Sequence, residues 1–134
     1  MMDSGPALVS ILRQGPNLIA SIHTALDDSQ LAQFQRDLID RIGEYRSRGV
    51  IIDVAALDVL DSFAAFTLRN IAEMARLRGA AATIVGIQPD VAFAMVELGL
   101  DTGSVPTALD LEAGLEYLSG IGRSSDLRTG RDGQ

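Results

Sequence analysis

Residues 50–55 read Val-Ile-Ile-Asp-Val-Ala, and this run, followed by a loop and the segment 62–78, decides the fold class. The run is apolar on both sides of the chain and is interrupted only by Asp53, as is typical of a central strand buried on both faces. In the following segment, apolar residues recur at helical spacing on one broad face, which is predicted to contain Ala65, Leu68, Ala72, Ala75 and Leu77. A buried strand followed by an amphipathic helix is the repeating unit of a parallel α/β sheet.

The same alternation continues toward the C-terminus. Residues 81–85 are aliphatic and predict another strand, after which Pro89 is well placed to begin a helix that ends at Gly99. Thr107 and Asp110 then form a box-like cap for a last, short helix. The apolar face of this helix is predicted to contain Leu111, Leu115 and Leu118.

Toward the N-terminus, two short aliphatic runs, residues 7–13 and 18–22, flank a Gly-Pro turn and predict a pair of strands. Asp28 is predicted to cap a helix of about five turns that ends near Gly49. The complete pattern predicts an α/β fold, with a single mixed, mostly parallel β-sheet and about four helices packed on it.

Length and composition limit the function. A chain of 134 residues suits one domain, predicted here over residues 7–119, between a flexible N-terminus at 1–6 and a disordered tail at 120–134. The chain has no cysteine, and all of its basic residues are arginine, which excludes thiolate and lysine chemistry. A net charge of −7 argues against nucleic acid as a partner. No run is long enough to cross a membrane, and no signal peptide is evident, so we expect a cytoplasmic protein.

Candidate chemistry gathers after the central strand. Asp53, Asp58 and Asp61 could together hold Mg²⁺, but turn and cap roles for these carboxylates are the favoured interpretation, so no metal site is predicted. Ser62 has no G-x-S-x-G context, and on local grounds it is an ordinary helix cap. His23 is the only histidine and is expected to be a partly buried residue at a strand end rather than a ligand.

Several residue strings, taken with the element order, resemble one family over residues 7–119. The strings are Val50-Ile-Ile-Asp-Val54 with Val59-Leu-Asp-Ser-Phe63, then Val85-Gly-Ile-Gln-Pro89 followed by Val96-Glu-Leu-Gly-Leu100, and then Thr107-Ala-Leu-Asp-Leu-Glu112. They resemble the STAS domain, the fold shared by anti-sigma-factor antagonists and the cytoplasmic part of sulphate transporters. Within that family the chain is similar to the RsbS-type antagonists of the bacterial stressosome.

The resemblance implies a binding protein rather than an enzyme, with no cofactor. Ser62 corresponds to the serine that a kinase of the RsbT type phosphorylates in the family. Release of the sequestered kinase is then the signal. The surface expected to bind the kinase consists of Asp58, Asp61, Ser62, Phe63 and Phe66.

Departures from related groups favour the RsbS type. RsbR-type co-antagonists carry threonine at the positions of Ser62 and Ala94, and SpoIIAA-type antagonists usually have a small residue where Phe63 stands here. The resemblance also implies association with RsbR-type paralogues, as a homodimer or a large hetero-oligomer. Two alternatives stay open: a SpoIIAA-type antagonist of an anti-sigma kinase, and a STAS module that binds a small ligand.

Overall fold

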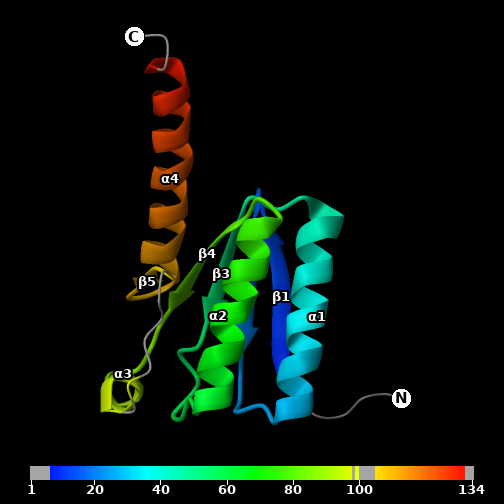
Figure 1. The fold of residues 1–134 in the computed structure, drawn as a ribbon, viewed down its shortest axis with the longest axis vertical. Helices are drawn as coiled ribbons and strands as arrows, with labels where there is room; N and C mark the ends of the chain where they lie inside the picture. The colour runs from blue at the N-terminus through cyan, green and yellow to red at the C-terminus, as the bar shows by residue number, and fades with distance from the viewer. Residues whose placement is uncertain (1–6, 98, 100–104, 132–134) are drawn as a thin grey trace.

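The computed structural model describes residues 7–97, 99 and 105–131, with side chains described as far as Ile121. Its core is a five-stranded sheet in which the strands lie side by side in chain order. β1 pairs antiparallel with β2, and the other neighbouring pairs are parallel, which confirms the predicted mixed, mostly parallel sheet (Figure 1). The strands are β1 (Val9–Gln14), β2 (Asn17–Ile22), β3 (Gly49–Asp53), β4 (Ala81–Val85) and β5 (Thr107–Ala108). The N-terminus predicted to be flexible, residues 1–6, lies outside the described residues.

Helices cover both faces of the sheet. They are α1 (Asp28–Tyr45), α2 (Ser62–Leu77), α3 (Pro89–Glu97) and α4 (Leu111–Arg131). α1 and α2 lie side by side on one face, and α4 packs on the other (Figure 1). Alternate residues of β3 explain both contacts: Val50 and Ile52 join the core under α1 and α2, whereas Ile51 packs with Leu118 of α4. This two-sided burial is the reason that the strand is apolar throughout.

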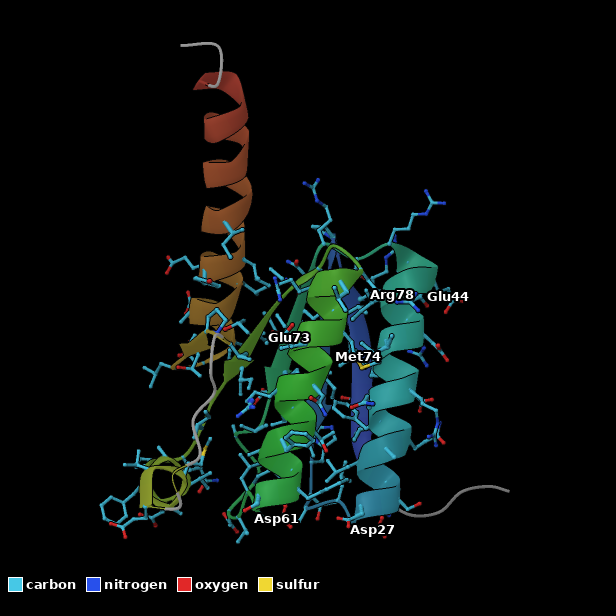
Figure 2. All side chains as sticks on the ribbon, in the orientation of Figure 1. Asp27, Glu44, Asp61, Glu73, Met74 and Arg78 are labelled. Atoms are coloured by element: carbon cyan, nitrogen blue, oxygen red, sulfur yellow. The ribbon has the colours of Figure 1, made fainter. Side chains whose placement is uncertain are left out.

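The parallel strands place the starts of two helices at one edge of the sheet. β2, β3 and β4 end at this carboxyl edge, and α1 and α2 begin there, with Asp27 and Asp61 at the same end of the molecule (Figure 2). In parallel α/β sheets, ligands and partners commonly bind at this edge, because the connecting loops gather there.

Two predicted helix boundaries are wrong. The cap of α1 is Asp27, one residue before the predicted cap Asp28: the side chain of Asp27 accepts a hydrogen bond from the Gln30 N–H, and the Gln30 side chain accepts one from the Asp27 N–H. The helix ends at Tyr45 rather than near Gly49, because Arg46 takes a left-handed conformation (φ 51°) that closes the last turn.

The remaining corrections concern α2 and α4. Leu77, predicted to lie on the buried face of α2, is 82% exposed, because its position is two residues past Ala75 and therefore points away from that face. The tail from Gly120, predicted to be disordered, is helical as far as Arg131. Ile121 continues the three-residue spacing set by Leu115 and Leu118, so the helical pattern does not stop where the composition changes. Among the described residues, no helix is long and apolar enough to cross a membrane.

Candidate functional site at the start of the second helix

The loop between β3 and α2, residues 54–61, is anchored by an apolar side chain at every third position. Val54, Leu57 and Leu60 are all buried, and they belong to the core under α1 and α2. Between them, Asp58 and Val59 are exposed, and Val59 exposes 66% of its surface. The loop therefore has a fixed inner side and presents a mixed acidic and apolar outer side.

The cap of α2 is Asp61 and not Ser62. The carboxylate of Asp61 accepts a hydrogen bond from the Ala64 N–H at 2.8 Å, and the first backbone bond of the helix runs from the Ala65 N–H to the Asp61 carbonyl. The local interpretation of Ser62 as the cap is therefore wrong. Asp61 and Ser62 are both good capping residues, and the backbone conformation at Asp61 (ψ 177°) decides between them.

Ser62 consequently occupies the first helical position with an exposed side chain. Within the described part of the chain, its hydroxyl forms no hydrogen bond. The N–H groups of Ser62 and Phe63 precede the first backbone bond of the helix, so only solvent or a bound group can satisfy them. The first turn also lacks an acidic residue, which leaves the positive end of the helix dipole uncompensated beyond the cap.

Aromatic side chains surround this helix start. Phe63 is 43% exposed and Phe66 is 53% exposed, although rings of this size are usually buried. The guanidinium of Arg69 lies 6.0 Å from the centre of the Phe66 ring. One turn of α2 is further fixed by Thr67, whose hydroxyl donates to the Phe63 carbonyl at 2.8 Å. Phe63 and Phe66 therefore form an exposed apolar surface next to Ser62.

The three aspartates do not form a metal site. The carboxylate of Asp53 accepts the Ala55 N–H at 2.9 Å, that of Asp61 caps α2, and Asp58 lies on the exposed side of the loop. Among the described residues, no group of three side chains that commonly ligate metals lies close enough to hold an ion. His23 is exposed rather than partly buried, and its Nε2 lies 3.1 Å from the Ser10 hydroxyl.

A neighbouring element, α3, extends the carboxyl edge and was not among the predicted site residues. It buries Val91 and Met95 and exposes Phe93 (69%) and Val96 (76%). The turn before it is tied to the β3–α2 loop, because the Gln88 side chain donates from Nε2 to the Ala55 carbonyl at 2.7 Å. The two partners are 33 positions apart in the chain, so the sequence carries no local signal of the contact.

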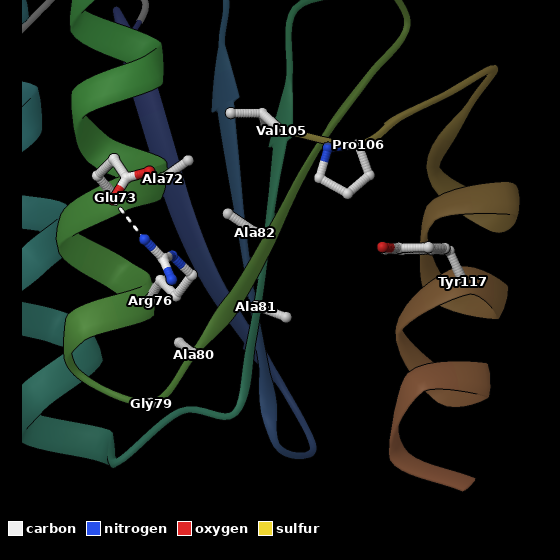
Figure 3. Close-up of a pocket in the computed structure, with 10 residues that line it drawn as sticks. All are labelled: Ala72, Glu73, Arg76, Gly79, Ala80, Ala81, Ala82, Val105, Pro106 and Tyr117. Carbon is white, nitrogen blue, oxygen red and sulfur yellow. Dashed lines mark hydrogen bonds and ion pairs between the residues drawn. The ribbon is translucent and has the colours of Figure 1, made fainter. Parts of the chain in front are cut away.

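A cavity of about 420 Å³ lies elsewhere, between α2 and α4 beside β4 (Figure 3). It is open to solvent, and its polar side chains include Glu73 and Arg76, which form an ion pair at 2.8 Å. Small side chains line much of it. The lining residues are Ala72, Glu73, Arg76, Gly79, Ala80, Ala81, Ala82, Val105, Pro106 and Tyr117.

Comparison with known proteins places this geometry in a family. Residues 9–113 match the STAS domain. The chain belongs to the STAS-domain family. It is 30% identical over 91 residues to the RsbT co-antagonist protein RsbRA of Bacillus subtilis, a match that covers 68% of this chain and 33% of the relative. The aligned part of this STAS chain therefore spans about a third of the length of that co-antagonist.

Solved structures give the same assignment. RsbS of Moorella thermoacetica, in a form with a serine-to-glutamate substitution, is 35% identical with a TM-score of 0.76, and the match covers 87% of this chain and 99% of that one. A chain of the stressosome, a signal integration and transduction hub, is 31% identical with a TM-score of 0.70, covering 85% of this chain and 99% of that one. These matches confirm the predicted resemblance to RsbS-type antagonists. Unphosphorylated SpoIIAA, at 10% identity and a TM-score of 0.63, shares the fold alone.

Proposed function

We propose that this STAS domain is a non-enzymatic antagonist of the RsbS type that sequesters a serine kinase of the RsbT type and releases it when Ser62 is phosphorylated. The observation that carries the proposal is the exposed, unbonded hydroxyl of Ser62 at the first position of α2, next to the exposed rings of Phe63 and Phe66. Support also comes from relatives that are named as a co-antagonist of RsbT and as a stressosome component.

The position of Ser62 makes phosphorylation compatible with the fold. A phosphoryl group adds about −1.5 to −2 charges, and at the start of a helix the free N–H groups and the dipole stabilise an anion. No neighbouring side chain is displaced, because the Ser62 hydroxyl is exposed. We therefore expect the modified domain to remain folded.

The same modification opposes kinase binding. The surface around Ser62 already carries the carboxylates of Asp58 and Asp61, and a dianion there must lose water when a partner covers it. Repulsion and desolvation of this kind cost on the order of several kcal/mol at an interface. About 1.4 kcal/mol changes a dissociation constant tenfold, so this is enough to release a bound kinase.

Two substitutions of Ser62 test the switch. Ser62→Ala is expected to bind the kinase and to retain it after ATP is added, because the phosphoryl acceptor is gone. Ser62→Asp is expected to weaken binding while the melting temperature stays within about 2 °C of wild type, the shift of a small surface change. Binding is measured by calorimetry with the purified kinase.

Ser29 provides the matched control. It is an exposed serine in the first turn of the other long helix at the same edge, α1. We expect Ser29→Asp to leave kinase affinity unchanged. A Ser62→Ala protein that still releases the kinase on addition of ATP contradicts the proposal.

We also propose that the domain assembles with RsbR-type STAS paralogues into a large hetero-oligomer. The supporting observation is the similarity to RsbRA and RsbRB of Bacillus subtilis and to a stressosome chain. Light scattering on a mixture with a purified paralogue from the same host tests this. A particle far larger than either component supports assembly, and two separate small species argue against it.

A further inference from the structure

The β3–α2 loop, which leads to Ser62, is held from one side by the end of β4 and the turn into α3. The Val54 N–H donates to the Val85 carbonyl at 3.0 Å, and the Gln88 side chain donates to the Ala55 carbonyl at 2.7 Å. At Gly86 (φ 81°), a Cβ atom would lie 2.9 Å from the Cβ of Ala55, so the two turns pack with backbone against backbone. Glycine is needed there both for the conformation and for this close approach.

Ala55 is fixed through both of its backbone polar groups. Its N–H is bonded to the Asp53 carboxylate at 2.9 Å, and its carbonyl accepts from Gln88. The Asp53 bond is local, whereas the Gln88 bond joins the β3–α2 loop to a separate element. Beyond Ala55, Leu57 and Leu60 anchor the inner side of the loop, and Asp58 and Val59 depend on these anchors for their outward position.

We propose that Gln88 is a positioning residue for the partner surface, because it holds the loop that presents Asp58 and Val59 next to Ser62. This inference rests on the proposed kinase-binding function. Without the amide donor, the loop has to be ordered when the partner binds, and that entropy cost lowers affinity. Ser62 itself is fixed by α2 and the Asp61 cap, so phosphoryl transfer from a bound kinase is unaffected.

The proposal requires a hydrogen-bond donor at the end of the side chain at position 88. Three substitutions distinguish this requirement from one for side-chain shape. Gln88→Glu keeps the shape but presents a carboxylate to the Ala55 carbonyl, and Gln88→Leu removes the polar group. Gln88→Lys restores a donor. We expect the first two substitutions to raise two quantities about fivefold: the KM of the RsbT-type kinase for this chain, and the dissociation constant of their complex. This increase is the cost of ordering a few side chains. We expect Gln88→Lys to recover most of the loss, and kcat to stay within about twofold throughout, since only binding is affected.

Gln33→Glu is the matched control, because Gln33 on α1 also donates from Nε2, to Asp37 at 2.7 Å, and lies outside the proposed surface. A fall in kcat at unchanged KM overturns the proposal, as does an equal loss of affinity in the Gln33 variant. A lower melting temperature with unchanged kinase affinity shows that Gln88 is merely structural, and it also overturns the proposal.

Hydrogen exchange of the amides of residues 56–60 gives a readout that does not involve the kinase. Faster exchange in Gln88→Glu, with the exchange of α2 unchanged, shows that Gln88 holds the loop. Unchanged exchange in the loop overturns the proposal. If the wild-type chain does not bind the kinase at all, the proposed function fails, and the exchange result still decides whether Gln88 positions the loop.

Discussion

The two long helices on the same face, α1 and α2, begin in similar ways but present different surfaces. Each has an aspartate cap at the carboxyl edge of the sheet, Asp27 for α1 and Asp61 for α2. α1 has a complete capping box and Asp28 in its first turn, whereas α2 has alanine at the position where Gln30 completes the box in α1. The start of α1 is therefore closed by its own side chains, and the start of α2 retains free N–H groups.

The exposed sides of the two helices also differ: that of α1 is polar, and that of α2 carries aromatic rings. On α1, the Gln33 side chain donates to Asp37 and accepts from Arg36, which is the usual solvent-facing pattern. On α2, the first two turns expose Phe63 and Phe66. Both helices bury an apolar face against the same sheet, so the difference is not needed for the fold. This difference supports the proposal that the exposed surface of α2 binds a partner.

The largest expected effect comes from the shared role of the two helices in the core. Leu38 of α1 and Leu68 of α2 are both buried, at 0% and 2% exposure. We expect Leu38→Ala and Leu68→Ala each to lower the free energy of unfolding by about 3 kcal/mol, because each leaves a cavity. Urea denaturation measures this. A loss below about 1 kcal/mol for Leu68→Ala would show that α2 is not an equal part of the core.

The next largest effect is on kinase affinity, and we expect it for a substitution on α2 but not for one on α1. We expect Phe66→Ala to reduce kinase affinity by about 2 kcal/mol, roughly thirtyfold, because it removes an aromatic anchor from the interface. Its free energy of unfolding should change by less than about 0.5 kcal/mol, since the ring is half exposed. Calorimetric titration of the kinase and urea denaturation give the two values. Arg36→Ala, on the exposed side of α1, serves as the control. An equal loss of kinase affinity in this variant would show that α2 is not distinguished from α1 as the binding surface.

The smallest effect concerns the caps. Asp27→Ala removes both bonds of the capping box and is expected to cost about 1.5 kcal/mol of stability, whereas Asp61→Ala removes a single cap bond and is expected to cost about 1 kcal/mol. Urea denaturation of the two variants under one set of conditions compares them. A larger cost for Asp61→Ala would mean that the start of α2 is stabilised by more than its cap.

Much of the fold could be predicted from periodicity. The apolar run of β3 and the helical spacing of α2 predicted a strand and a helix that the structure confirms, because burial on two faces and on one face produces different patterns. Errors occurred where two neighbouring residues had equal capping ability, as at residues 27–28 and 61–62. The helix beyond Gly120 was missed because composition, rather than spacing, was followed there.

The candidate site was less accessible to prediction. Local sequence favoured a capping role for Ser62, and only the resemblance to a family pointed to phosphorylation. The structure assigns the cap to Asp61 and so leaves the Ser62 hydroxyl exposed and unbonded. The bond between Gln88 and Ala55 could not be predicted, because it depends on the parallel pairing of β3 with β4, which brings distant turns together.

The most direct test of the phospho-switch follows modification and kinase release in one sample. The wild-type complex with the kinase is given ATP, and at each time the phosphoryl occupancy of Ser62 is mapped by mass spectrometry while the bound kinase is measured by size-exclusion chromatography. We predict a single modification at Ser62 and a loss of bound kinase in proportion to its occupancy. Full occupancy of Ser62 with the kinase still bound, or release with Ser62 unmodified, would contradict it.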